Sequence, residues 1–261
     1  MMRHVLVVAV SVWSCSCSAV RAPEAPWRPP EGEPIIERVA VPGTTVELEF
    51  VRLRGAADSG RDLCVARTEM TWALAELFHT SHIKPERMKK LRLDAVTRPT
   101  VPYVSPLHDT WGPSATRPAM YISSKHAKGC AHWLSLACER PLRLPTESEW
   151  DRLCTAVPRV PIGRYAWTAA NAGERAHDAG TLDADGLGLF DLQGNVSEWV
   201  VRSGDVCVLK GASYADADAD ANCVRAIEDT AALSDGDPQD PKSQWWRVGA
   251  PWAGFRVVFE D

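Results

Sequence analysis

Prolines interrupt this chain too often for long helices to form. There are 19 prolines and 17 glycines among 261 residues, and a proline inside a helix removes a backbone donor and clashes with the preceding turn. We therefore expect short helices and short strands joined by much irregular structure. The hydrophobic fraction of 45% is ordinary for a globular protein, so a core can form. Eleven tryptophans add wide apolar faces, each with one N–H donor.

The first residues of the chain are typical of an export signal. A basic start precedes an apolar run over residues 5–13, which is too short to span a bilayer but suits a secretory signal peptide over residues 1–19. Cleavage after Ala19 predicts a freely secreted protein, whereas lipid modification of Cys15 or Cys17 predicts an anchor in the membrane. Both alternatives place the protein outside the cytoplasm, in the periplasm or on the cell surface.

The rest of the chain divides into a linker and one domain. Residues 20–42 hold six prolines among several charges and are expected to form an extended, proline-rich linker. Residues 43–261 contain no repeat and no second linker, so they are expected to form a single domain. The net charge of −5 argues against a nucleic-acid partner, because nucleic-acid-binding surfaces are normally basic.

Hydrophobic periodicity predicts a few short elements. Residues 45–51 alternate apolar and polar side chains, as in a strand, and residues 71–78 are typical of a short helix. A second helix is expected after Ser123 or Ser124, with an apolar stripe that includes Cys130. A third helix begins near residue 145, where Thr146 and Glu149 have the spacing of a capping box.

Six cysteines remain after the first 19 residues. An even number in an exported chain permits up to three disulfides, with fifteen connectivities if all of them pair. No pair of cysteines has the spacing of a zinc site. The six are Cys64, Cys130, Cys138, Cys154, Cys207 and Cys223.

Six motifs follow one another in order along most of the chain. They are VARTEMT (65–71), RPAMYIS with GCAHWL (117–123 and 129–134), RLPTESEW (143–150), GLFDLQGNVSEW (188–199), KGASY (210–214) and GFR (254–256). The set resembles the formylglycine-generating enzyme, or sulfatase-modifying factor, family. The resemblance implies a compact α+β fold related to the C-type lectin fold.

The resemblance also implies calcium in the turn within residues 188–199. The implied ligands are the side chains of Asp191 and Glu198 and the backbone carbonyls of Gly194 and Val196. Calcium accepts such a mixture of carboxylate and carbonyl oxygens, and a metal-free, hydrogen-bonded turn is the alternative. A second metal site is implied near Asn171, with Asp178 as a later ligand, although the loop between them is shortened here.

Catalysis in active members of this family depends on copper(I) held by two cysteines that follow the KGASY-like motif. Counted from Ser213, these positions hold Asp216 and Ala221. Neither residue supplies the soft thiolate that copper(I) requires. The one cysteine nearby, Cys223, cannot form a site of two thiolates alone. We therefore expect no copper and no catalytic residues.

A disulfide is a further implication of the resemblance. Relatives join the cysteine at the position of Cys130 to a residue just after the catalytic loop, which falls at Arg225 or Ala226 here. Cys223 lies two or three residues earlier, so a bond between Cys130 and Cys223 requires a local shift in register, with Cys207 as the next candidate partner. Two buried free thiols are the alternative.

The acidic loop over residues 216–220 lacks the pattern of an EF-hand. Such a loop needs glycine at its sixth position and glutamate at its twelfth, where Ala221 and Ile227 stand. We interpret it as a solvated loop, or as a weak contact for a cation or ligand. Tyr214, Asp216 and Asp220 are the residues expected to form such a ligand surface.

Three functions follow from these observations. The first is an exported, catalytically silent domain that binds an unknown protein or a small-molecule or glycan ligand. The second is a copper-dependent oxidase that makes formylglycine in sulfatases, which the missing cysteine pair disfavours. The third is an iron enzyme of the sulfoxide-synthase kind, which would need an additional helical domain with a His-x-x-x-His-x-Glu motif that this sequence lacks.

Overall fold

The computed structural model describes residues 27–29, 31–80, 114–234 and 248–261. Its strands are β1 (Ile35–Ala40), β2 (Glu47–Leu53), β3 (Leu63–Ala66), β4 (Ser197–Ser203), β5 (Val206–Lys210), β6 (Ala226–Glu228), β7 (Ala253–Gly254) and β8 (Val258–Glu260). Its α-helices are α1 (Trp72–Thr80), α4 (Ser124–Ala137) and α5 (Glu147–Ala156). Short 3-10 turns are η1 (Ile162–Arg164), η2 (Asp218–Asp220) and η3 (Ala231–Ser234). The predicted signal peptide, with Cys15 and Cys17, lies outside the described residues.

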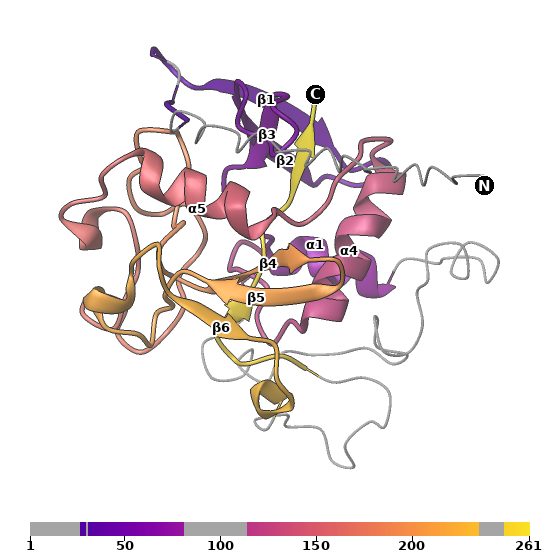
Figure 1. Cartoon of the computed structure of the whole chain (residues 1–261). Helices are drawn as coiled ribbons and strands as arrows, with labels where there is room; N and C mark the ends of the chain where they lie inside the picture. Colours follow the sequence, from indigo (N-terminus) through magenta and orange to yellow (C-terminus); the bar gives the residue numbers. More distant parts are fainter. Residues whose placement is uncertain (1–26, 30, 81–113, 235–247) are drawn as a thin grey trace, which may run out of the picture.

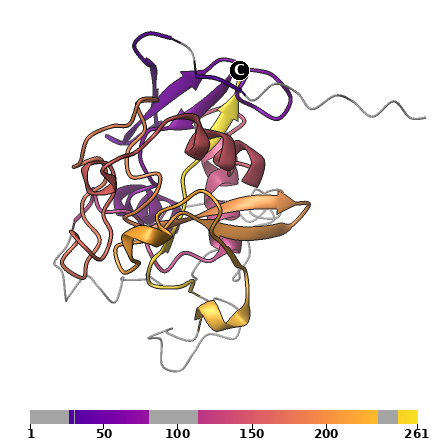
Figure 2. The ribbon, with the colours of Figure 1, turned by 60° about the vertical axis from the view of Figure 1, so that its left-hand side comes forward.

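The strands form two separate four-stranded sheets. One has the order β1-β2-β3-β8 and the other the order β6-β5-β4-β7. In Figures 1 and 2 the first sheet lies at the top of the domain and the second sheet lies below it, with α5 at a height between the two. Long irregular segments join the elements, so the predicted α+β fold with short helices and strands is confirmed. Within the described part of the chain, no helix combines the length and apolar character needed to cross a bilayer.

The predicted capping box at the start of α5 is confirmed. The backbone N–H of Glu149 donates to Thr146 Oγ1 at 3.1 Å, and the backbone N–H of Thr146 donates to Glu149 Oε2 at 2.9 Å. Arg143 also binds the Glu149 carboxylate through both of its terminal nitrogens, each at 2.7 Å. The motif RLPTESEW therefore sets the direction of α5 through one buried carboxylate.

The first sheet begins earlier than the sequence analysis predicted. Six residues of β1 pair antiparallel with β2, from Ile35 opposite Arg52 to Ala40 opposite Glu47. The predicted linker over residues 20–42 therefore extends too far, and part of it belongs to the domain. Prolines flank this strand at positions 34 and 42 but do not interrupt it, so its backbone can pair. Farther upstream, the indole N–H of Trp27 donates to the carbonyl of Arg54 at 2.8 Å.

The core connects both sheets with the helices. The largest cluster of buried apolar residues includes side chains of β2, β3, α1, α4, β4, β5 and β8. Trp199 of β4 is fully buried there, and its indole N–H donates to the carbonyl of Ile122 at 2.6 Å. Trp150 of α5 is equally buried and donates to Glu198 at 3.3 Å. The tryptophans thus pack the interior and also satisfy buried acceptors.

Candidate functional site

The loop after β5 holds the two positions at which active relatives carry copper-binding cysteines. At the first position, the Asp216 carboxylate accepts hydrogen bonds from the backbone N–H of Ser213 at 2.9 Å and from its hydroxyl at 2.6 Å. Its other oxygen forms an ion pair with Arg225 at 2.7 Å. Burial alone would raise the pKa of Asp216, but the hydrogen bonds from Arg225 and Ser213 hold it below its ordinary value. Asp216 is therefore a charged and fully engaged structural group.

The acidic loop is docked against the preceding irregular segment. The backbone N–H of Ala169 donates to the carbonyl of Asp216 at 2.8 Å, and the hydroxyl of Thr168 donates to Asp218 Oδ1 at 2.5 Å. Tyr214 is 8% exposed, whereas Asp216 and Asp220 are partly exposed. Burial, with the charges of Tyr121 and Asp216, raises the pKa of Tyr214 to about 12. The predicted ligand surface therefore consists mainly of the two aspartates, with the tyrosine beneath them.

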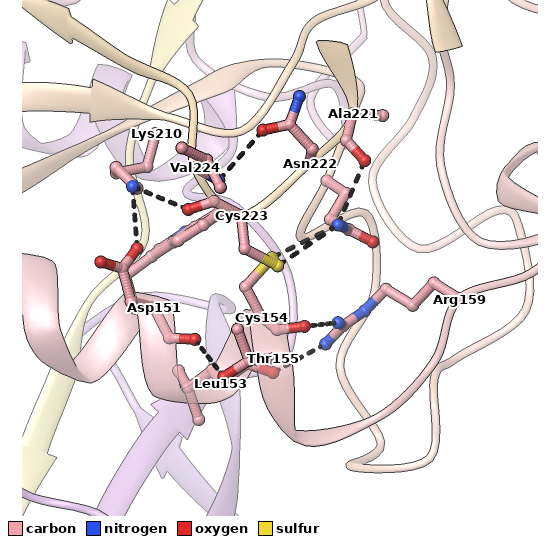
Figure 3. The surroundings of a disulfide bond; sticks show 12 residues. Asp151, Leu153, Cys154, Thr155, Arg159, Lys210, Ala221, Asn222, Cys223 and Val224 are labelled. Carbon is pink, nitrogen blue, oxygen red and sulfur yellow. Dashed lines mark hydrogen bonds and ion pairs between the residues drawn. A yellow bond between two sulfur atoms is a disulfide. The ribbon is translucent and has the colours of Figure 1, made fainter. Parts of the chain in front are cut away.

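A disulfide anchors the far side of this loop, and Figure 3 shows its surroundings. It joins Cys223 to Cys154 of α5, with 5.6 Å between their Cα atoms. The predicted bond between Cys130 and Cys223 is therefore wrong. Cys130 is a free thiol, fully buried on the core face of α4, and burial raises its pKa. The loop passes over the C-terminal end of α5 instead, which places a different helix cysteine next to Cys223.

Two further side chains fix the loop around the disulfide. Nε2 of Gln193 donates to the carbonyl of Ala221 at 3.2 Å. Lys210, at the end of β5, donates from Nζ to the carbonyl of Cys223 at 2.9 Å and forms an ion pair with Asp151 at 2.8 Å. Ala221, the second of the two positions, thus has a methyl side chain and a carbonyl that is already bonded.

Beneath this loop, the turn with the predicted calcium ligands has a tightly constrained backbone. Asp191 and Asn195 adopt positive φ angles of 56° and 61°. A Cβ atom on Gly194 would lie 2.5 Å from the carbonyl oxygen of Trp167, so only glycine fits there. The side chain of Asn195 bonds both the N–H and the carbonyl of His177, at 3.0 and 3.2 Å. These contacts bring Asp191 and Glu198 into the same buried region.

The two carboxylates of this turn have different partners. Glu198 binds the fully buried guanidinium of Arg256, at 2.5–2.8 Å, and also accepts from Trp150. Burial would lower the pKa of Arg256, but Glu198 raises it above its ordinary value. Asp191 accepts only from the N–H of Gly180, at 2.9 Å, and its Oδ1 has no donor among the described residues.

A cation would therefore fit against Asp191, whereas Glu198 is committed to Arg256. Within the described residues, no group of three or more His, Cys, Asp or Glu side chains is arranged to hold a metal. Calcium would have to use backbone carbonyls as well, as the resemblance implies. Calcium at this turn stays a prediction.

The second predicted metal site has other partners for each of its side chains. Oδ1 of Asn171 accepts from the N–H of Thr168 at 2.8 Å, and its amide nitrogen donates to two backbone carbonyls. Asp178 accepts from the hydroxyl of Ser114 at 2.5 Å. Both side chains therefore have hydrogen-bonding partners within the protein, and a metal between them stays a prediction.

The sequence analysis missed Glu69, which lies beside this turn. It is fully buried between β3 and α1, and neither oxygen of its carboxylate has a donor in the described part of the chain. Burial and the charge of Asp191 raise the pKa of Glu69 well above its ordinary value, against the opposing charge of Arg256. Burial likewise raises the pKa of Asp191 to about 6. The one sequence feature that marks Glu69 is that it is the acidic residue of the motif VARTEMT. Hydrophobic periodicity alone does not distinguish such a buried residue from an exposed one.

The chain is similar to a known protein family in sequence and to solved proteins in structure. A family model described as "Sulfatase-modifying factor enzyme 1-like domain" matches residues 106–260. No curated protein sequence matches the chain. Variable protein 1 of Treponema denticola has a similar structure, with a TM-score of 0.59 and 16% identity over 88% of this chain and 100% of its own.

PvdO from Pseudomonas aeruginosa is also similar in structure. Its TM-score is 0.50, with 16% identity over 87% of this chain and 92% of its own. At such low identity, both likenesses establish a shared fold and nothing about a shared ligand.

Proposed function

Since the chain belongs to the family of sulfatase-modifying factor enzyme 1-like domains, we propose that it is a catalytically silent member. It would act as an exported binding domain for a protein or for a small-molecule or glycan ligand. The proposal that the protein is catalytically silent is supported by the side chains of the loop after β5.

The single observation that carries the proposal is the set of bonds made by the carboxylate of Asp216. Its carboxylate is held by Arg225 and Ser213, so the first copper position has become part of the scaffold. Copper(I) requires soft thiolate ligands, which neither Asp216 nor Ala221 provides. Cys223 cannot substitute, because its sulfur is bonded to Cys154.

The same loop is suited to binding because it is fixed at its base. The disulfide and Lys210 both hold the loop at Cys223, and Thr168 holds it at Asp218. Asp216 and Asp220 remain partly exposed on it. A loop that is ordered before a ligand arrives loses less conformational entropy on binding, which favours affinity. Its acidic side chains suit hydroxyl-bearing or cationic ligands, which glycans and basic peptide segments supply.

Export is part of the proposal and is supported by the disulfide. Structural disulfides persist in oxidising compartments and are rare in the cytosol. The bond between Cys154 and Cys223 therefore favours a periplasmic or cell-surface location. A calcium ion at the turn of Asp191 is also part of the proposal, as a structural ion that would stabilise the turn beneath the loop.

The catalytic half of the proposal is tested with a substrate peptide. The purified protein is incubated with copper and a peptide of the form Cys-x-Pro-x-Arg, beside an active formylglycine-generating enzyme as a positive control. We expect mass spectrometry to show the cysteine unchanged. Conversion of the thiol to an aldehyde would overturn the proposal and would favour the copper-dependent oxidase.

The binding half is tested on glycan and peptide arrays. Ligands retained by the wild-type protein are measured again with Asp220→Ala, which changes a partly exposed side chain of the loop. Asp205→Ala is the matched control, because Asp205 is a fully exposed aspartate at the turn between β4 and β5. Weaker binding by Asp220→Ala alone supports the acidic loop as the ligand surface, and equal binding by all three proteins contradicts it.

A further inference from the structure

A cavity of about 370 Å³ lies between α4, the segment that leads into α5, and the turn from β4 to β5. Its volume falls within the range of small-molecule sites, about 300–1,000 Å³. The five residues of β5, each rising about 3.3 Å, separate this cavity from the acidic loop, which follows the other end of the strand. The cavity is therefore distinct from the ligand surface of the proposed function.

Apolar side chains from all three sides form part of the cavity wall. They are Ala131, Leu142, Leu144 and Val201. All four belong to the largest core cluster or pack against it, so their positions are fixed before a ligand arrives. A wall that is formed in advance costs a ligand little ordering entropy. The body of a ligand that fits this wall is apolar.

Two polar side chains of the wall are already committed to other groups. Arg143 binds both oxygens of Glu149 and one oxygen of Glu260, each at 2.7 Å. The hydroxyl of Thr146 donates to Asp58 at 2.6 Å and accepts from the backbone N–H of Glu149 at 3.1 Å. The polar partners of a ligand must therefore come from the remaining side chains of the wall.

The donors that remain lie on α4. Lys128 and His132 are four residues apart, so they lie on the same face of the helix, one turn from each other. Nζ of Lys128 donates to the backbone carbonyl of Asp205 at 2.6 Å. The carboxylate of Asp205 is 3.5 Å from Nζ and is fully exposed, and such exposed ion pairs are weak. A ligand carboxylate can therefore take its place beside Lys128.

We propose that this cavity binds a small monocarboxylate with an apolar body, such as a short branched or aromatic acid. The ligand carboxylate accepts hydrogen bonds from Lys128 and His132, and charge-assisted bonds of this kind are strong. The apolar body lies against the leucines and Val201. One carboxylate matches the one available ammonium, whereas a second would be repelled by Asp205.

The test uses nuclear magnetic resonance on the full chain labelled with nitrogen-15. The protein is titrated with phenylacetate and, separately, with phenylacetamide, which has nearly the same shape but no charge. We expect phenylacetate to cause saturable shifts of the backbone amide signals of Ala131 and Gly204, which lie on two sides of the cavity. Phenylacetamide should bind about tenfold more weakly, because a hydrogen bond to a charged group is lost.

A pair of variants on α4 locates the carboxylate. Lys128→Met removes the ammonium but keeps an apolar stem, and should bind phenylacetate about tenfold more weakly while its affinity for phenylacetamide is unchanged. Lys125→Met is the matched control, because Lys125 is an exposed lysine on the same helix outside the cavity wall. It should keep the wild-type affinity for both compounds.

Three results would overturn the inference. The first is the absence of saturable shifts at the cavity in the wild type. The second is equal binding of acid and amide, which would show a purely apolar cavity and needs no variant. The third is an equal loss in Lys125→Met and Lys128→Met, which would show general attraction of anions to α4. None of these measurements involves the acidic loop, so their outcome is separate from the array test of the proposed function.

Discussion

Position 216 is one of the two positions at which active relatives carry copper-binding cysteines, and here its aspartate is bonded by neighbouring residues. A carboxylate in place of a thiolate would be an unpaired charge if nothing else differed. Arg225 and Ser213 compensate it from within the same loop, so the carboxylate has partners that define its position. An aspartate at this position is therefore compatible with a stable loop.

The ion pair of Asp216 predicts a pH-dependent stability difference. Because the folded-state pKa of Asp216 is lowered, its contribution is fully present above the ordinary aspartate pKa of about 3.9 and is lost as the pH falls through the folded value. Urea unfolding at pH 3 to 7 should show wild type more stable than Asp216→Asn near neutral pH, with the difference shrinking in acid. A difference that is constant with pH would contradict the assignment.

Glu69 illustrates what residue types alone cannot reveal. An acidic residue in a short motif is normally exposed, so the sequence offers no reason to bury it without a partner. Its environment consists of Asp191, Glu198 and Arg256, which lie more than a hundred residues away in the chain. All four residues stand in motifs that are visible in the sequence, but their convergence depends on tertiary structure.

Among the elements, local signals were sufficient for the helices. The predicted helix over residues 71–78 corresponds to α1 at Trp72–Thr80, and the two later helices begin where their caps indicated. A capping box depends on two residues three positions apart, so it can be predicted from the sequence alone. The predicted disulfide was wrong because cysteine pairing depends on which helix lies next to a distant loop. Cys130 and Cys154 both lie on helices, and the sequence does not show which of the two helices the loop with Cys223 approaches.

The cap of α5 predicts a measurable loss of stability. Thr146→Ala removes the acceptor for Glu149 N–H and the hydrogen bond that the hydroxyl donates to Asp58 at 2.6 Å. We expect a cost of about 1–2 kcal/mol in chemical denaturation, as for other threonine caps. Thr155→Ala, on the same helix, is the matched control, because that hydroxyl bonds only carbonyls of its own helix. Equal losses in both variants would show that the cap is unimportant.

The disulfide predicts which cysteines control stability under reducing conditions. Cys154 and Cys223 are 69 residues apart, and closing a loop of that size stabilises a fold by about 4 kcal/mol in the chain-entropy picture. The variant Cys154→Ala/Cys223→Ala should lose about that amount and should not respond to dithiothreitol.

Cys130→Ala/Cys207→Ala is the control, because both thiols are free and buried. It should keep the full response to dithiothreitol and lose only packing energy. Peptide mapping that finds Cys130 joined to Cys223 would contradict the structure.

For the whole molecule, the N-terminal boundary determines whether the first sheet is complete. A chain that begins at Trp27 keeps β1 and the hydrogen bond to Arg54, and should match the full chain in thermal unfolding. A chain that begins at residue 43 lacks β1, which exposes one edge of β2 and removes Val39 from the core. We expect it to lose at least about 2 kcal/mol from that side chain and the strand pairing together. Equal stability of both shortened chains would restore the predicted boundary.

The pairing of β3 with β8 also affects biosynthesis. Leu63–Ala66 can find its second neighbour only after Val258–Glu260 has been translated, nearly two hundred residues later. Arg256, the counter-ion of Glu198, emerges from the ribosome at almost the same moment. Until then the first sheet has an open edge and the buried carboxylates have no cation, so a nascent chain cannot settle into the native state. The native arrangement of the first sheet therefore becomes available only when nearly the whole chain has been made.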